Sequence, residues 1–149
     1  LTGGIRLTLQ NTRTDDDLNV ARLVVTATTA SHEPAIYKDL HPTEDGWNPS
    51  LLPGTPTGEV GGIEGNQDVQ FISDMTLYLK DGIHDYKTIA CNNGTITFCM
   101  PILARDVKYL IVKGYSSTDD LLFTKTKELE TATPILRNVM YNIPTIEIQ

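Results

Sequence analysis

The sequence predicts an all-β fold, built as a two-layer β-sandwich of about eight or nine strands. Apolar residues alternate with polar ones along most short runs, as they do in strands that bury one face. Glycine, proline, asparagine and aspartate cluster between these runs and supply turns. No helical pattern is long enough to join parallel strands, which disfavours an α/β architecture. A chain of 149 residues has the size of one domain, so we expect residues 1–149 to form a single sandwich.

Three alternating runs are the clearest strands. They lie at residues 5–10, 22–27 and 69–79. Their apolar positions are Ile5, Leu7 and Leu9; Leu23, Val25 and Ala27; and Val69, Phe71, Met75, Leu77 and Leu79. The third run ends at Lys80-Asp81-Gly82, a sequence typical of a tight turn. Each run is expected to place one face in the core.

Two turns in the second half of the chain predict β-hairpins. Asn93-Gly94 is a strong two-residue turn, and it predicts that residues 86–91 pair with residues 95–100. The polar residues 116–120 predict a second hairpin loop, between Tyr115 and Leu121. Residues 128–137 are the one place where we expect a helical turn.

A long loop region is expected at about residues 28–67, which hold five prolines and six glycines. Long loops in compact domains are functional or carry short edge strands, and residues 35–38 are the best candidate for such a strand. Trp47 lies in this region beside Asn48. Its ring could stack on a sugar as a surface platform, or it could anchor the loop to the core.

The closing segment, residues 138–148, changes the phase of its alternation. One parity holds Val139, Tyr141 and Ile143, and the other holds Ile146 and Ile148. Pro144 stands between the two sets and predicts a bulge or an edge position. A final edge strand can complete its own core or pair with another chain.

No arrangement of catalytic, cofactor-binding or metal-binding residues is visible in the sequence, so we expect a protein that is not an enzyme and needs no cofactor. His32, His41 and His84 are spaced too widely and irregularly for a metal motif. Asp15-Asp16-Asp17 lacks the alternating acidic pattern of a calcium loop and is expected to be a solvated turn. None of the serines lies in a Gly-x-Ser-x-Gly elbow.

Charge and cysteine content narrow the partners further. The net charge of -7 repels phosphate backbones, so nucleic acid is not expected as a partner. Cys91 and Cys99 flank the Asn93-Gly94 turn, which would place Cys91 opposite Ile96. A disulfide between the two cysteines therefore needs a bulge or a longer loop. We expect instead two small buried thiols.

The C-terminal third of the chain, from Thr95 onward, resembles the fimbrillin and Mfa-like surface proteins of Bacteroidales. The matching features are Ile96-Thr97-Phe98 before Met100-Pro101-Ile102-Leu103, Tyr109-Leu110-Ile111-Val112 before Gly114-Tyr115, and Leu136-Arg137-Asn138 before Tyr141-Asn142-Ile143. These follow the order found in that family: a strand that ends in proline, a strand with a polar turn, and a closing strand.

The resemblance implies a transthyretin-like sandwich, with an Ig-like Greek key as the alternative topology. It implies a lipoprotein-derived subunit outside the cytoplasm, at the cell surface, the outer membrane or in a fimbrium, with other fimbrial subunits or surface proteins as partners. Only a lipid anchor would then attach it to a membrane. Assembly by β-strand addition would use the segment that contains Val139, Tyr141, Ile143, Ile146 and Ile148. The alternative is a glycan-binding module of a surface lipoprotein, with Trp47 in contact with host or microbial glycans.

Overall fold

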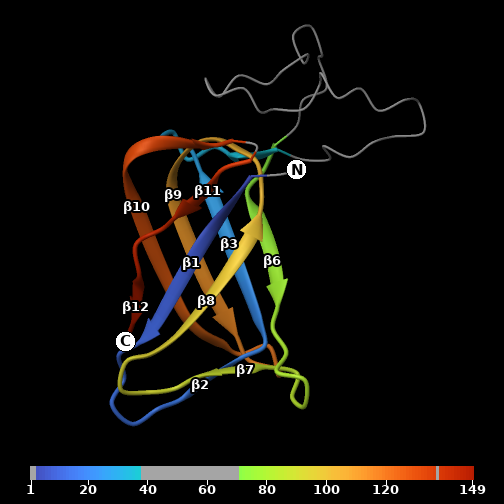
Figure 1. Cartoon of the computed structure of the whole chain (residues 1–149), viewed down its shortest axis with the longest axis vertical. Coiled ribbons are helices and arrows are strands. Elements are labelled where there is room, and N and C mark those ends of the chain that lie inside the picture. Colours follow the sequence, from blue (N-terminus) through green and yellow to red (C-terminus); the bar gives the residue numbers. More distant parts are fainter. Residues whose placement is uncertain (1–2, 38–70, 137) are drawn as a thin grey trace, which may run out of the picture.

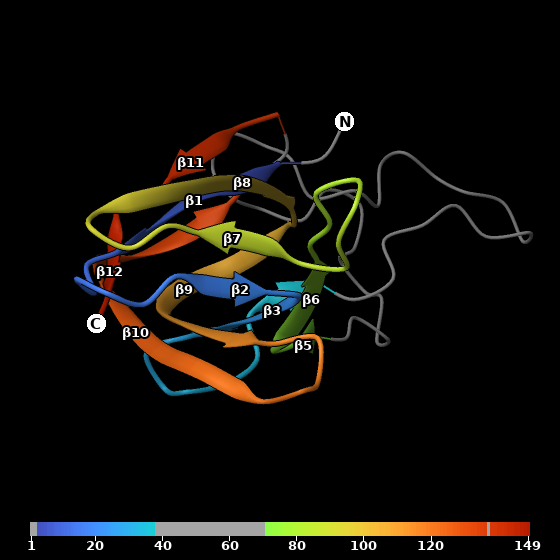
Figure 2. The same ribbon diagram turned by 90° about the horizontal axis from the view of Figure 1, so that it is seen from below.

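The computed structural model describes residues 3–37, 71–136 and 138–149. Within these residues the protein forms twelve strands and no helix, which confirms the predicted all-β class. Two sheets face each other across an apolar core, and a two-stranded ribbon lies at one end (Figures 1 and 2). The number of strands exceeds the expectation because several long strands are interrupted.

The first sheet has the N-terminal strand at its centre. Its members are β1 (Gly4–Asn11), β8 (Gly94–Pro101), β11 (Met140–Asn142) and β12 (Ile146–Ile148). β8 pairs antiparallel with the whole length of β1. Because β8 occupies one edge of β1, the parallel strands β11 and β12 share the other edge, one after the other.

The second sheet is built around the long strand β9. Its members are β3 (Arg22–Thr28), β4 (Ile36–Tyr37), β5 (Phe71–Ile72), β6 (Asp74–Tyr78), β9 (Ala104–Tyr115) and β10 (Leu121–Ile135). β10 pairs with one edge of β9, while β3 and β4 follow each other along the opposite edge. β6 and β5 extend the sheet beyond β3 and β4. β4 falls within the residues where a short edge strand was expected in the loop region.

The core lies between the inward faces of the two sheets. Ile5, Leu7 and Leu9 are at most 1% exposed, and the predicted inward residues of β3 are fully buried. The ribbon consists of β2 (Leu18–Val20) and β7 (Lys87–Ile89). It crosses the end of the sandwich and adds three buried side chains, Leu18, Val20 and Ile89 (Figure 2). The ribbon therefore seals the core at that end.

The hairpin predicted at Asn93-Gly94 is wrong. The chain does turn there, since Asn92 and Asn93 both have positive φ and Gly94 N donates to Ala90 O at 3.0 Å. The strands on either side nevertheless pair elsewhere: β7 pairs with β2, and β8 pairs with β1. The second predicted hairpin, between Tyr115 and Leu121, is present as the β9–β10 connection.

The helical turn expected at residues 128–137 is also wrong, because β10 continues to Ile135. Between Glu128 and Thr133 the strand carries extra residues relative to β9, so it bulges. Lys108 fills the gap, and its Nζ donates to Leu129 O at 2.6 Å and Glu130 O at 3.0 Å. A cation on the neighbouring strand thus satisfies carbonyls that the ladder leaves free.

Candidate functional site: the C-terminal edge

The C-terminal edge, residues 138–149, runs along β1 in two parallel pieces. Arg6 pairs with Asn142 and Leu9 pairs with Ile146, so three steps along β1 match four steps along this segment. The extra residue falls around Pro144, which has no N–H to donate to a ladder. The predicted change of phase is therefore a one-residue bulge between β11 and β12.

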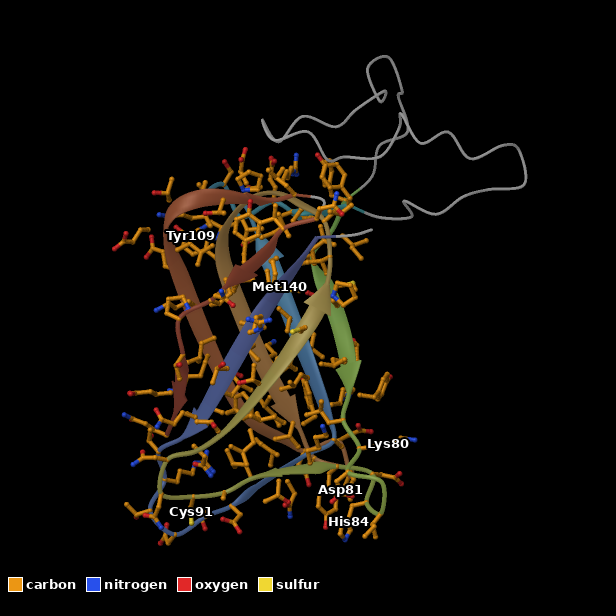
Figure 3. All side chains as sticks on the ribbon, viewed as in Figure 1. Lys80, Asp81, His84, Cys91, Tyr109 and Met140 are labelled. Atoms are coloured by element: carbon orange, nitrogen blue, oxygen red, sulfur yellow. The ribbon has the colours of Figure 1, made fainter. Side chains whose placement is uncertain are left out.

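The segment's apolar side chains do not share one environment. Ile143, Ile146 and Ile148 are 9%, 6% and 0% exposed and belong to the core. Tyr141 is half-buried and packs against that core. Val139 is 41% exposed, so the five residues proposed for strand exchange divide into three core residues, one flanking residue and one surface residue. Figure 3 shows the neighbouring Met140, itself 43% exposed, near the start of the segment.

Backbone hydrogen bonds tie the segment to β1 at both ends. Gly4 N donates to Val139 O at 3.0 Å, and Ile143 N donates to Arg6 O at 3.0 Å. Just beyond β1, the backbone N and Oγ1 of Thr12 both donate to Ile148 O, at 2.9 and 2.8 Å. In the part of the chain that the structure describes, no strand pairs with the outer edge of β11 or β12. The segment is thus an edge strand with one hydrogen-bonded neighbour.

Asn11, at the end of β1, is the one fully buried polar residue among those described. Its Nδ2 donates to Asp16 O at 2.8 Å and to Ile89 O at 3.0 Å, and its Oδ1 accepts from Arg13 N at 3.1 Å. Every polar atom of the side chain is therefore used. Sequence reasoning missed this residue, since an asparagine after an alternating run is typical of an ordinary turn.

The acidic turn after β1 forms a contact with the turn before β8. Asp17 Oδ1 accepts a hydrogen bond from Cys91 N at 2.9 Å. That bond lowers the pKa of the Asp17 carboxyl, and the hydrogen bond and charge of the carboxylate raise the pKa of the Cys91 thiol. Asp15 and Asp16 are exposed, as expected for a solvated turn.

Both cysteines are free, and the expectation of two buried thiols is wrong. Cys91 is partly exposed at the turn, at the end of the molecule seen in Figure 3. Cys99 is exposed because it lies on the outward face of β8, opposite Arg6. Alternation along β8 explains this placement: Met100, its neighbour, takes the core position.

The histidines that the structure describes lie in separate surroundings. His32 stacks on Tyr109, with ring centroids 4.7 Å apart. His84 Nδ1 lies 2.8 Å from Asp81 Oδ2 and its ring stacks on Tyr86. Among the described residues, no group of three or more His, Cys, Asp or Glu side chains could hold a metal ion. His41 and Trp47 lie outside the described residues.

Comparison with known proteins adds no relative. No family model, curated protein or solved structure matches the chain. None of the described elements is a helix of the length and apolar character needed to span a bilayer.

Proposed function

We propose that the protein is a non-enzymatic structural or adhesive subunit of the cell surface, similar to fimbrillins, that associates with other subunits by β-strand exchange. Its partners are further copies or related surface proteins, and its place is outside the cytoplasm. The C-terminal edge carries the proposal. Among the residues that the structure describes, it pairs with one strand only, and it supplies three isoleucines to the core.

Those isoleucines make the segment energetically important. Full burial of one such side chain stabilises a protein by about 1.5–3 kcal/mol. The burial free energy of all three is comparable to a large part of the free energy of unfolding of a small domain, which is roughly 5–15 kcal/mol. A sandwich that lacked the segment would expose the edge of β1 and an open strip of core. The same segment from a second chain would restore the same contacts.

Pairing between β1 and β12 can be tested with introduced cysteines. Gln10 and Glu147 are register partners on the outward face of the first sheet, and paired strands bring Cα atoms close enough for a disulfide. One chain carries Gln10→Cys and a second carries Glu147→Cys, both with Cys91→Ser and Cys99→Ser. The two chains are unfolded, mixed, refolded together and oxidised under gentle conditions.

Strand exchange predicts a heterodimer linked between the two introduced cysteines. The control pairs Glu147→Cys with a chain that carries Asp106→Cys, an exposed residue of the second sheet. This pair measures cross-linking by random collision. A yield no greater than that of the control would contradict the proposal, because exchanged copies must bring the register partners together.

A further inference from the structure

A groove of about 300 Å³ opens where β3 begins, β6 ends and the β9–β10 hairpin turns. Arg22, Tyr78, Lys80, Asp85, Ser117 and Asp119 contribute to its lining. A volume of this size is at the lower end of the range for small-molecule sites. The groove lies apart from the C-terminal edge, because its walls come from the second sheet and its loops.

One wall continues into a row of side chains across the second sheet. Arg22 is the register partner of Tyr78 on β6 and of Tyr115 on β9, and Tyr115 is the partner of Leu121 on β10. The Arg22 guanidinium lies over the Tyr115 ring, 4.1 Å from its centroid. From the spacing of strands, the two tyrosines stand about 10 Å apart. Tyr78 is 71% exposed and Leu121 55%, so the row presents apolar surface to solvent.

The β6–β7 loop that forms the other wall is held in shape by Asp81. Its Oδ1 accepts hydrogen bonds from the backbone N atoms of Ile83 and His84, and its Oδ2 lies 2.8 Å from His84 Nδ1. Figure 3 shows Asp81 and His84 together beside Lys80 at this end of the molecule. A loop ordered before binding loses less conformational entropy when a ligand arrives.

The β9–β10 turn beside the groove is ordered in a similar way. Ser116 Oγ accepts hydrogen bonds from the backbone N atoms of Thr118 and Asp120, at 3.2 and 3.1 Å. Asp119, in the same turn, has a positive φ, and its Oδ1 lies 3.3 Å from Arg22 Nη2. The carboxylate and the guanidinium are thus placed next to each other at the mouth of the groove.

The chemistry of the lining selects a class of ligand. The lining contains two cations, Arg22 and Lys80, and two carboxylates, Asp85 and Asp119, so the groove has no net charge that would favour an ionic ligand. Guanidinium and ammonium groups donate hydrogen bonds, and carboxylates accept them. A sugar offers hydroxyls that do both and a face of C–H groups that packs on an aromatic ring.

We propose that this groove binds a neutral oligosaccharide. Tyr78 forms the stacking platform, and the charged side chains hydrogen-bond the hydroxyls of the sugar that enters the groove. The row of side chains from Tyr78 to Tyr115 extends the site by the length of a second sugar ring. The lining residues of this site do not include Trp47, and the site does not depend on strand exchange.

The full chain, labelled with ¹⁵N, is titrated with neutral gluco-, manno-, galacto- and xylo-oligosaccharides and followed by amide NMR. The expected result is saturable shifts confined to residues 21–22, 78–85 and 115–121 for at least one oligosaccharide. Tyr78→Ala should weaken that binding by about tenfold, because it removes the stacking face. Tyr78→Phe keeps the ring and should retain most of the affinity.

Ile83→Ala is the matched control, since Ile83 is 89% exposed on the β6–β7 loop that follows Tyr78 but does not line the groove. It should bind like the unmodified chain. Absence of any saturable shift, unchanged affinity in Tyr78→Ala, or shifts that map elsewhere would overturn the proposal. Tyr78→Ala should leave interchain cross-linking between Gln10→Cys and Glu147→Cys unchanged, so failure of one proposal is distinguishable from failure of the other.

Discussion

Asn11 joins three parts of the chain through a single side chain. Its amide bridges the end of β1, the acidic turn at Asp16 and the end of β7 at Ile89, away from solvent. A buried hydrogen-bonded amide contributes modestly by its presence, but its removal leaves partners unpaired and desolvated. Loss of the Asn11 side chain should therefore destabilise the fold more than its hydrogen bonds stabilise it.

Replacement of Asn11 by leucine, which is close in size, should lower the free energy of unfolding by about 1–3 kcal/mol. The carbonyls of Asp16 and Ile89 would lose their donor inside the protein. Urea denaturation followed by circular dichroism measures the change. Gln10→Ala, one residue earlier and half-buried, is the control; an equal loss in both variants would show that the amide network has no special role.

The Cys91 thiol should react more slowly with alkylating reagents than its exposure alone predicts. The Asp17 carboxylate raises the pKa of the thiol, so the reactive thiolate is less populated at neutral pH. Asp17→Asn removes that charge and should speed the alkylation of Cys91 by iodoacetamide near pH 8. Mass spectrometry of both cysteines provides the measurement, with Cys99 as the internal reference. An unchanged ratio of the two rates would contradict this explanation.

The loop that contains Asp81 should lose its order in acid. Hydrogen bonds from His84 and Ile83 lower the pKa of the Asp81 carboxyl from 3.8 to about 2. Because the folded pKa is depressed, the stabilisation is complete above the unfolded value near 4 and is lost as the pH falls through about 2. Carboxyl ¹³C titration should show Asp81 among the last carboxyls to protonate, and Asp81→Asn should abolish the pH-dependent shift of the Ile83 and His84 amides.

At the scale of the elements, alternation predicted the strands but not their partners. The local alternation of Ile5, Leu7 and Leu9 predicts β1, and all three side chains are buried in the structure. Pairing is non-local, however, so the Asn93-Gly94 turn suggested a hairpin between strands that belong to different sheets. A sequence that favours a turn determines the local bend of the chain, but it does not determine whether the two flanking strands pair with each other.

Interrupted strands were the second feature that local patterns could not resolve. β10 runs through residues 129–132 because Lys108, on the neighbouring strand, satisfies the carbonyls of its bulge. Arg105 has a similar role where β3 gives way to β4: its Nε and Nη2 donate to Pro34 O at 3.1 and 2.7 Å. Neither cation lies near the interrupted segment in the sequence. Two irregularities are marked by a proline within the segment itself: Pro144 lies between β11 and β12, and Pro134 lies at the register shift of β10 between Thr133 and Ile135.

In the candidate site, too, local features could be predicted from the sequence and non-local ones could not. The phase change around Pro144 placed Ile146 and Ile148 correctly on one face, because parity is a local property. Val139 was grouped with Tyr141 and Ile143, yet it is exposed, since it precedes the first register pair of β11. The groove at Tyr78 was invisible in the sequence, because three separate segments form it.

Within β12, the two isoleucines should contribute far more than the residue between them. Ile146→Ala or Ile148→Ala should each destabilise the protein by about 2–5 kcal/mol, from lost burial and the cavity left behind. Glu147→Ala, on the outward face, should change stability by no more than about 0.5 kcal/mol. Chemical denaturation of the three variants gives the comparison. Equal effects would mean that β12 does not pack in the core as described.

At the scale of the whole molecule, the first strand, β1, pairs with the last two strands, β11 and β12. Arg6 bonds Asn142 across 136 residues of sequence, with Nη1 of the arginine 3.1 Å from Oδ1 of the asparagine. Contacts of such separation form slowly, because the chain between them must be ordered or looped out first. During that delay β1 presents an unpaired edge, and the C-terminal segment of any nearby chain is an equivalent partner.

Refolding should therefore give more dimer as protein concentration rises, since the bimolecular exchange competes with a slow intramolecular closure. Size-exclusion chromatography with light scattering, over a hundredfold range of concentration during refolding, measures the dimer fraction. The control is a single chain with Gln10→Cys, Glu147→Cys, Cys91→Ser and Cys99→Ser, oxidised while it is folded and monomeric. Its disulfide keeps β12 on its own β1 through unfolding and refolding. If this locked chain dimerised as readily as its reduced form, association would have to use another surface; if it stayed monomeric while the reduced form dimerised, the C-terminal edge would be the element exchanged.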